Sequence, residues 1–376
     1  MEMTIMGQKA LQERVHRAQL CTGCGACVDL CPYQVFYNDQ TIVLDACDLK
    51  EGRCYAFCPR TPADLQAMRD RFFAPADWTP EVGAVKGYLI ARAADGEKRR
   101  RAQHGGTVSA LMALALDEGL IDTAVVAEGA DRFLQRGVAV GDGAEVLKRG
   151  KSRFIAAATV AAFNRAVKGP AGAIGVVATP CQVFALAKMR MKPLPERDNN
   201  IDKLKLVIGL FCGWTLQWRK FTELLAARTD LEAITGMDIP QGKRLVVVYT
   251  RDGSIEIPWA EVAPLAREAC GVCIDTTAEF ADLSVGSARI GAPWEETRTW
   301  NQVIVRTEAG QALLDLARRK GVLEFREPPA GALAELKAAA LDKKRQSLGT
   351  LIARTGDPGD LIYLDPGDPM IRRVLA

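Results

Sequence analysis

The pattern of apolar and polar positions changes after about residue 85. From there to about residue 260, short apolar runs typical of buried strands alternate with stretches of helical period. A β-hairpin is expected at 244–250 and 254–258, with Asp252-Gly253 as its turn. Alternation of this kind predicts an α+β fold with an α/β-like mixed sheet. The predicted strands are 87–93, 124–127, 172–178 and 204–210, and the predicted helices are 107–118, 156–166, 181–189 and 220–227.

Both ends of the chain depart from this alternation. Residues 1–20 have a helix-like polar pattern, while 21–62 are rich in turns and contain few large apolar residues. A linker with prolines follows, and the chain ends in an Ala/Lys-rich helix and a tail rich in Gly, Pro and Asp. We therefore divide the chain into five parts, which are 1–62, 63–84, 85–165, 166–330 and 331–376.

Composition and charge exclude several classes of protein. The 376 residues are 48% hydrophobic and 25% charged, which is ordinary for a globular protein. A net charge of +3 is too small to indicate nucleic-acid binding. The N-terminus has no apolar core of a signal peptide, and no run is long enough to span a membrane. These features predict a cytoplasmic protein without a membrane span.

The cysteines carry the most specific signal. Seven of the eleven lie between Cys21 and Cys58, and the first four occur in C-T-G-C-G-A-C-V-D-L-C-P. The spacing C-x2-C-x2-C-x3-C-P is typical of a bacterial-ferredoxin [4Fe–4S] cluster. Cysteines in a cytosolic chain are more often metal ligands than disulfides. The motif therefore predicts one-electron transfer and makes an oxidoreductase the leading class.

In two-cluster ferredoxins, the first three cysteines of one motif share a cluster with the last cysteine of the other motif. This rule assigns one [4Fe–4S] cluster to Cys21, Cys24, Cys27 and Cys58. Small residues between the first cysteines let the backbone fold tightly around the sulfurs. A structural zinc site is the alternative, although C-x2-C pairs alone would be adequate for zinc.

The second motif lacks one cysteine. Crossing over leaves three thiols for it, those of Cys31, Cys47 and Cys54. These three could hold a [3Fe–4S] cluster, or a [4Fe–4S] cluster with a non-cysteine ligand such as Asp48 or Asp45. The site could also be empty. A second cluster is favoured because free thiols packed this densely would invite oxidation.

Four cysteines remain, namely Cys181, Cys212, Cys270 and Cys273. Cys181 and Cys212 each follow a predicted strand, and the last two form a C-x2-C pair. Taken singly, the first two would more often be buried core cysteines. Together the four make a plausible scattered four-thiolate site, and their spacing does not distinguish zinc from an iron–sulfur cluster.

Segments of the alternating region resemble the family of coenzyme F420 hydrogenase/dehydrogenase beta subunits. The resemblance covers about residues 85–330, and the segments occur in the family's order. They are H-G-G-T-V-S-A-L-M-A-L-A-L-D-E-G-L-I-D-T-A-V-V (104–126), G-K-S-R-F (150–154), A-T-P-C-Q (178–182), I-G-L-F-C-G (208–213), C-G-V-C-I-D (270–275), A-E-F-A-D-L-S-V-G-S (278–287) and W-N-Q-V-I-V-R-T (300–307).

The resemblance implies the FAD-binding fold of these beta subunits, preceded here by a small ferredoxin-like iron–sulfur domain. Residues 85–165 would then be the flavin-binding part, and 166–330 would contain the scattered cysteine site. The family match implies a [4Fe–4S] cluster on Cys181, Cys212, Cys270 and Cys273. The eleven cysteines then divide into groups of four, four and three.

Several residues are candidates for contact with FAD. The glycine pair before the helix at 107–118 could bind pyrophosphate, since helix N-termini offer free N–H groups and a positive dipole end. The family match favours this function over a simple turn. The candidates are Gly105, Gly106, Thr107, Ser109, Lys151, Ser152, Arg153, Thr179, Gln182 and Lys243.

These cofactors predict an electron-transfer subunit without a catalytic side chain. FAD exchanges two electrons with a carrier such as an F420-type deazaflavin and passes single electrons to iron–sulfur clusters. The expected partner is a hydrogenase, dehydrogenase or ferredoxin-like protein in a hetero-oligomer. The alternatives are a reductase of the same family acting on a chlorophyllide-type substrate, a non-catalytic electron-relay subunit and a zinc-stabilised binding module.

Overall fold

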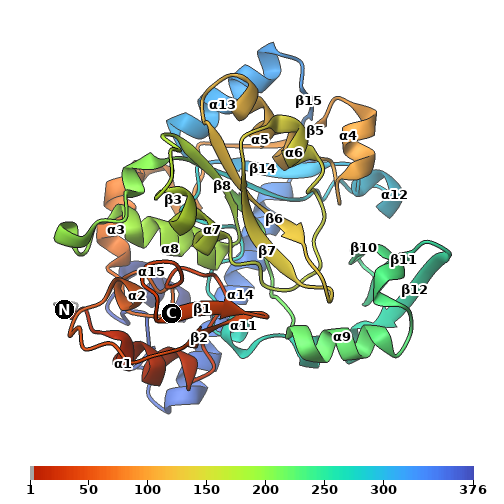
Figure 1. Cartoon of the computed structure of the whole chain (residues 1–376). Helices are drawn as coiled ribbons and strands as arrows, with labels where there is room; N and C mark the ends of the chain where they lie inside the picture. The colour runs from red at the N-terminus through yellow and green to blue at the C-terminus, as the bar shows by residue number, and fades with distance from the viewer. Residues whose placement is uncertain (1–3) are drawn as a thin grey trace.

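A mixed sheet of eight strands forms the centre of the molecule (Figure 1). The computed structural model describes residues 4–376. The strand order is β15-β5-β14-β13-β9-β8-β6-β7. The four inner strands β13, β9, β8 and β6 run parallel, and the outer strands pair antiparallel to their neighbours. The bounds are β5 (Gly87–Ala93), β6 (Thr123–Gly129), β7 (Gln135–Val140), β8 (Ile174–Ala178), β9 (Leu204–Leu210), β13 (Leu283–Ser287), β14 (Asn301–Val305) and β15 (Leu323–Arg326).

Alternate residues of the inner strands bury opposite faces of the sheet. Val176 and Val207 pack in one core cluster with α7 (Thr159–Ala166) and α8 (Pro180–Arg190). Leu206 and Ile208 pack in another cluster, with α5 (Thr107–Asp117) and α13 (Glu308–Arg319). Helices therefore cover both faces, which explains why β8 and β9 are apolar at nearly every position.

The N-terminal segment forms a small unit beside the sheet and near α11 and α15 (Figure 1). The helix predicted over residues 1–20 extends from Gln8 to His16, and residues 1–3 lie outside the described range. A two-stranded hairpin and one short helix follow. The unit consists of α1 (Gln8–Leu11), the π-helical turn η1 (Gln12–His16), β1 (Gln34–Tyr37), β2 (Gln40–Val43) and α2 (Arg53–Ala56).

The segment 63–84, predicted to be a linker, contains regular structure. Asp64 caps its helix by accepting a hydrogen bond from the Ala67 N–H at 2.8 Å. The aromatic rings of Phe73 and Trp78 pack against Phe280 of the main domain. The elements are α3 (Leu65–Phe72), η2 (Pro75–Asp77), β3 (Trp78–Thr79) and β4 (Gly83–Ala84).

A second antiparallel sheet projects from the main domain near α9 (Figure 1). It contains β10 (Ile234–Asp238), β11 (Leu245–Thr250) and β12 (Gly253–Pro258). The register pairs Thr250 with Gly253, so the hairpin turn is Arg251-Asp252 and not Asp252-Gly253. Gly253 has a φ of 151° and begins the second strand. The predicted turn is therefore shifted by one residue.

The last 45 residues form two helices that pack against the N-terminal segment. These are α14 (Ala332–Thr355) and α15 (Pro369–Leu375). Leu348 and Ile371 share one core cluster with Leu11 and Val15. The tail thus closes the structure over the N-terminal unit.

The remaining elements are short and connect the larger ones. The hydrophobic periodicity predicted the long strands and helices between 87 and 227, but not the strands β7, β13, β14 and β15. No helix within residues 4–376 is both long and apolar enough to cross a membrane. The other elements are α4 (Gly96–Arg101), α6 (Gly143–Leu147), η3 (Pro195–Arg197), η4 (Ile201–Lys203), α9 (Trp218–Ala226), η5 (Leu231–Ala233), α10 (Trp259–Val262), η6 (Ala263–Leu265), α11 (Glu268–Gly271) and α12 (Trp294–Thr297).

Candidate functional site

The four scattered cysteines meet at the carboxyl edge of the sheet; we call this group the central four-thiol site. Cys181 lies in the first turn of α8, directly after β8, and Cys212 lies just after β9. Because β8 and β9 are parallel neighbours, their carboxyl ends lie at the same edge. Cys270 and Cys273 come from α11 and the turn after it.

The thiols of the central site influence one another. Burial raises the pKa of Cys212, and the thiols of Cys270, Cys181 and Cys273 raise it further. The nearby thiols of Cys273 and Cys270 likewise add to burial in raising the pKa of Cys181. The Cys270 sulfur also accepts a hydrogen bond from the Thr215 N–H at 3.3 Å. The structure therefore brings together the four cysteines that the family resemblance selected.

Positive charge surrounds the central site. Burial acts to raise the pKa of Cys273, but the cations Arg60 and Lys343 outweigh it, so this pKa is lowered overall. The Lys343 ammonium donates hydrogen bonds to the backbone oxygens of Gly213 at 2.9 Å and Cys212 at 3.2 Å. The Arg60 guanidinium lies 4.8 Å from the centre of the Tyr363 ring. Cations favour thiolates, which are the form that binds iron.

A second group, the N-terminal four-thiol site, contains Cys21, Cys24, Cys27 and Cys58. Burial raises the pKa of Cys27, and the other three thiols add to this increase. Burial also raises the pKa of Cys58 to about 11, although Lys188 acts in the opposite direction. The backbone N–H of Arg60 donates to the Cys58 sulfur at 3.4 Å.

The glycines of the cysteine motif are required by packing against the main domain. Gly23 and Gly25 have φ values of 70° and 81°, which favour glycine. A Cβ at Gly25 would lie 2.8 Å from the Cβ of Ala158 and 2.9 Å from that of Ala161. The glycines therefore let the cysteine loop pack directly on the beginning of α7.

Lys188 is buried under the N-terminal four-thiol site. Its ammonium donates to the carbonyl oxygens of Cys58 at 2.7 Å and Thr61 at 2.9 Å, and to the Thr61 hydroxyl at 2.8 Å. Burial lowers the pKa of Lys188 to about 7, while Cys58 and Cys24 act to raise it. A bound iron–sulfur cluster is anionic together with its thiolates, so it would favour the charged lysine.

The N-terminal and central four-thiol sites adjoin each other. Burial is the main cause of the raised pKa of Cys24, and the next largest is the thiol of Cys181 in the central site. Arg60 follows Cys58 closely in the chain and acts on both Cys273 and Cys181. The two groups of four thiols are therefore neighbours, one in the N-terminal unit and the other at the edge of the main sheet.

The three-thiol site, which consists of Cys31, Cys47 and Cys54, is a third group of cysteines and belongs to the N-terminal unit. Burial raises the pKa of Cys54, and the thiols of Cys31 and Cys47 contribute to the increase. The two aspartates considered as a fourth ligand, Asp45 and Asp48, are exposed. One oxygen of Asp45 accepts a hydrogen bond from the Ala46 N–H at 2.8 Å.

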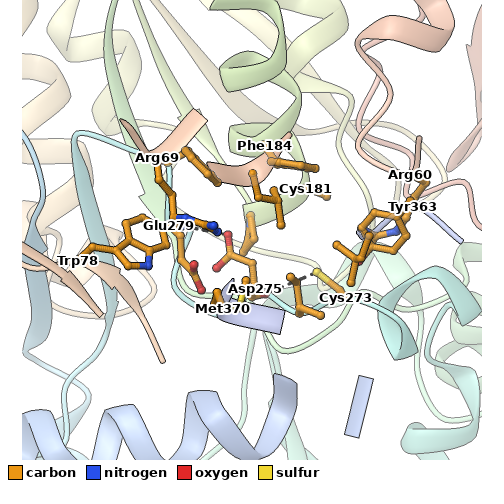
Figure 2. A pocket seen from close by; sticks show the side chains of 15 residues that line it. Arg60, Arg69, Trp78, Cys181, Phe184, Cys273, Asp275, Glu279, Tyr363 and Met370 are labelled. Atoms are coloured by element: carbon orange, nitrogen blue, oxygen red, sulfur yellow. Dashed lines mark hydrogen bonds between the residues drawn. The ribbon is translucent and has the colours of Figure 1, made fainter. Parts of the chain in front are cut away.

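A small cavity, of about 40 Å³, borders the central four-thiol site (Figure 2). Cys181 and Cys273 lie on its wall, with Arg60 and Tyr363 at one end and Trp78 at the other. Its lining is mainly apolar and includes residues of α3, α8 and the C-terminal tail. Among residues 4–376, no three His, Cys, Asp or Glu side chains meet as ligands of one metal ion.

A larger cavity, of about 350 Å³, lies between the main sheet and β10. It is lined by the three residues Lys151, Ser152 and Arg153 of the predicted flavin site. Four further ionic side chains line it, those of Arg101, Lys148, Arg149 and Glu128. The excess of cations suits an anion such as a pyrophosphate, and the volume is within the usual range of cofactor sites.

The glycine pair at the start of α5 lies outside the lining of this cavity. Gly106 adopts a φ of 77° as the N-cap residue, and the Thr107 hydroxyl donates to the Ala91 carbonyl at 3.1 Å. A Cβ at Gly105 would lie 2.8 Å from Asn301 Oδ1. The Ser109 hydroxyl lies next to Gly150, which lines the cavity. The glycines therefore allow a close backbone approach to β14, and their role in binding flavin stays a prediction.

Thr179 and Gln182 form a capping box at the start of α8. The Gln182 amide oxygen accepts from the Thr179 N–H at 2.8 Å, and the Thr179 hydroxyl lies 3.5 Å from the Cys181 sulfur. These contacts engage the side chains of Thr179 and Gln182 and leave few of their polar groups free for a flavin. Lys243 is exposed in the turn before β11 and lines neither cavity.

A buried polar cluster beside the glycine pair was not predicted. His104 Nε2 lies 3.6 Å from Asp238 Oδ1, and Arg298 lies 3.8 Å from the other carboxylate oxygen. Burial raises the pKa of Asp238 to about 6 and lowers that of His104 to about 4. Buried groups left without hydrogen-bond partners are His104 Nδ1, Asp238 Oδ2 and Trp294 Nε1. Such orphaned groups are typical of a ligand site.

Sequence reasoning also missed the cations near the thiols. Lys188, Arg60 and Lys343 come from three segments that are far apart in the chain, and each is an ordinary basic residue in its local pattern. One signal was available, since Lys188 lies on the apolar face of a predicted helix. A lysine is rarely buried without a partner.

Comparisons with known proteins agree with this arrangement. A 4Fe-4S binding domain matches residues 15–37. The N-terminal model of the beta subunit of coenzyme F420 hydrogenase/dehydrogenase matches 88–164, and the model of its C terminus matches 172–330. The fold and the iron–sulfur domain define an electron-transferring oxidoreductase subunit. The chain belongs to the family of coenzyme F420 hydrogenase/dehydrogenase beta subunits.

Individual relatives support the family membership. The beta subunit of coenzyme F420 hydrogenase from Methanothermobacter thermautotrophicus is 31% identical over 276 residues, which cover 71% of this chain and 95% of that protein. The beta subunit of coenzyme F420 hydrogenase from Methanosarcina barkeri is 28% identical over 279 residues, or 72% of this chain and 93% of that one.

A solved structure shows the same fold. One chain of the xenon-derivatised F420-reducing [NiFe] hydrogenase complex from Methanosarcina barkeri matches with a TM-score of 0.67 at 26% identity. The match covers 74% of this chain and 95% of that chain. The mixed α/β architecture predicted from the sequence is therefore confirmed.

Proposed function

We propose that this chain is an FAD- and iron–sulfur-dependent subunit that passes electrons between a two-electron carrier and a one-electron partner. FAD, when bound, exchanges electron pairs with a hydride carrier and single electrons with clusters. The carrier that we propose is an F420-type deazaflavin, in line with the names of the relatives. The observation that carries the proposal is the proximity of the N-terminal and central four-thiol sites, through Cys24 and Cys181.

Several groups of residues in this chain would form the proposed electron-transfer path. Cys181, Cys212, Cys270 and Cys273 would hold one cluster, and Cys21, Cys24, Cys27 and Cys58 would hold the next. Arg60, Lys188 and Lys343 would partly neutralise the clusters. The cation-lined cavity at 148–153 would hold the pyrophosphate of FAD. The His104–Asp238 cluster beside β10 would meet the polar part of a bound ligand.

The one-electron partner would dock at the N-terminal unit. Among residues 4–376, four of the six large apolar side chains that are exposed lie in this unit, between Tyr33 and Leu49. Leu44 and Leu49 are 62% and 56% exposed, and Leu49 lies between two cysteines of the three-thiol site. Exposed apolar groups of this kind often mark protein–protein contacts. They suit a redox partner subunit in a hetero-oligomer.

The test is anaerobic purification of the full chain, followed by quantification of iron, sulfide and flavin. We expect a brown protein with bound FAD and two or more clusters. The purified protein is then titrated separately with reduced F420, NAD(P)H and reduced ferredoxin. We expect reduced F420, the deazaflavin carrier, to bleach the flavin absorbance. A colourless protein with stoichiometric zinc would refute the proposal. A protein with clusters but no flavin would instead be a relay subunit.

The assignment of the flavin cavity needs a separate variant. Lys151→Ala should reduce FAD content, because Lys151 borders the cavity and its backbone segment matches the family. Lys243→Ala is the matched control, because Lys243 is exposed and lies outside both cavities. Equal loss of FAD from both variants would contradict the assignment to this cavity.

A further inference from the structure

A buried carboxamide whose oxygen has no partner borders the three-thiol site. Gln34 begins β1, three residues after Cys31, and its side chain is only 2% exposed. It lies beside Cys54, where burial raises the pKa of the thiol and the Gln34 side chain lowers it in part. That effect is a weak hydrogen bond, in which only Nε2 can be the donor, and its geometry is outside the ordinary range. The Oε1 atom of Gln34 has no hydrogen-bond partner.

A carboxamide with an unpaired oxygen is an expensive group to bury. Each polar atom that loses its hydrogen bonds to water without replacement costs roughly 1–3 kcal/mol. Gln34 pairs with Val43 across the hairpin, so an apolar residue would fit the inward position of this strand. A carboxamide at this buried position is explained if its polar atoms contact a group bound by the three-thiol site.

Other polar side chains around the three cysteines are already engaged or point to solvent. The Gln8 amide nitrogen donates to the Asp45 carbonyl at 3.1 Å, and the Thr41 hydroxyl accepts from Cys27 of the neighbouring site at 3.4 Å. Asp45 and Asp48 are exposed. Gln34 Oε1 is therefore the buried and unpartnered polar atom at this site.

We propose that Gln34 completes the three-thiol site, as the non-cysteine ligand of a [4Fe–4S] cluster held by Cys31, Cys47 and Cys54. The inference rests on the proposed function, since that function requires clusters in the N-terminal unit. Three thiolates supply three of the four iron positions, and the Oε1 atom of Gln34 supplies the ligand at the fourth. The geometry favours Gln34 over the two aspartates because Gln34 alone is buried against Cys54.

Ligation by a neutral oxygen has a chemical consequence. A carboxamide oxygen is a harder and weaker ligand for iron than a thiolate. The fourth iron would therefore leave more readily than irons held by cysteine. Loss of the fourth iron would follow one-electron oxidation of the cluster. In this step [4Fe–4S]²⁺ gives [3Fe–4S]⁺ and Fe²⁺, and the electron passes to an added oxidant such as ferricyanide.

The test compares Gln34→Leu and Gln34→Cys with the wild-type full chain, all purified without oxygen. Gln34→Leu should contain about one iron per chain fewer as isolated, and one-electron oxidation by ferricyanide should then give the EPR signal of an oxidised three-iron cluster without further loss of iron. Gln34→Cys should keep the wild-type iron content. It should also resist conversion to the three-iron form by ferricyanide under conditions that convert the wild type.

Controls separate this proposal from the proposed function. Gln40→Leu alters an exposed residue of the same hairpin and should leave iron content and spectra unchanged. If Cys54→Ser does not reduce iron content, the site holds no cluster and the cluster assignment itself fails. If Cys54→Ser loses iron but Gln34→Leu matches the wild type, Gln34 is not a ligand. A three-iron signal in the untreated wild type would also overturn the role of Gln34.

Discussion

At the scale of single residues, buried cations set the electrostatics of the thiol sites. Lys188 makes three close hydrogen bonds to Cys58 and Thr61 beneath the N-terminal four-thiol site. A fixed positive charge stabilises the reduced and more negative state of a nearby cluster. Lys188 should therefore raise the reduction potential of the cluster that we propose for this site.

The first prediction removes this charge. Lys188→Met should lower the reduction potential of the cluster by roughly 50 mV, which is about 1 kcal/mol for one electron. The measurement is an EPR-monitored redox titration of the full chain. Lys205→Met, on an exposed position of β9, should leave the potential unchanged. Equal potentials for Lys188→Met and the wild type would contradict the role assigned to Lys188.

The second prediction concerns Asp238 and pH. Burial raises its pKa to about 6 in the folded chain, against about 3.9 when unfolded. The folded state thus holds the proton more tightly, and the resulting stability is present at low pH and is lost as pH rises through 6. Between pH 5 and pH 7, Asp238→Asn should gain about 1 kcal/mol in unfolding free energy relative to the wild type.

Urea unfolding of both proteins at the two pH values measures this difference. His104 is present in both proteins, and burial holds its pKa near 4, so its own contribution largely cancels in the comparison. A difference between the proteins that does not change with pH would show that Asp238 keeps an ordinary pKa in the folded chain.

At the scale of elements, the start of α5 is fixed by the approach of Gly105 to β14. A Cβ at this position would lie 2.8 Å from Asn301 Oδ1 and 2.9 Å from the Thr299 carbonyl oxygen. Asn301 also accepts from the Thr107 N–H at 3.3 Å, so it holds the first turn of the helix. The glycine is required by packing, whether or not a phosphate binds nearby.

The third prediction follows from this contact. Gly105→Ala should destabilise the fold by about 1–3 kcal/mol, because the backbone or Asn301 must shift. Gly349→Ala is the control, since Gly349 is exposed in α14 and its added Cβ would meet nothing within 4 Å. That control should stabilise the chain by up to about 1 kcal/mol. Thermal unfolding midpoints of the two variants give opposite shifts if the contact acts as described.

At the scale of the whole molecule, the C-terminal tail seals the region around the central four-thiol site. Ser347 donates to the Cys273 carbonyl at 2.9 Å, and the Tyr363 hydroxyl donates to the Val272 carbonyl at 2.7 Å. Arg69 of α3 pairs with Asp368 at 2.5 Å, and both side chains are less than 10% exposed. This ion pair joins the segment before the main domain to the last helix.

The fourth prediction breaks that pair without removing the helix cap. Asp368→Asn keeps an oxygen for the Met370 and Ile371 N–H groups but leaves Arg69 buried without a counter-charge. We expect a loss of about 3–5 kcal/mol and faster proteolysis of the tail. Asp365→Asn, in the preceding turn, should change both measurements little. Similar behaviour of the two variants would mean that the ion pair does not hold the tail.

Much of the architecture could be predicted from the sequence. Strands such as β5 and β9 have the predicted bounds, because each is a mainly apolar run interrupted by a single cation, as expected of strands near the core of a sheet. The cysteine spacing predicted the iron–sulfur domain, which the family match confirms. Strands β13 and β14 escaped prediction because each is only five residues long and includes polar residues such as Ser284 and Gln302.

The sequence by itself determined which residues can bind iron, because thiolate chemistry and motif spacing are local properties. Only the tertiary structure decided what surrounds them. Cys181 and Cys212 meet because β8 and β9 are parallel neighbours, and Arg60, Lys188 and Lys343 reach the thiols from three distant segments. Gln34 looks like an ordinary hairpin residue until burial removes it from water beside Cys54. Burial and long-range pairing depend on the whole fold, which local sequence patterns do not record.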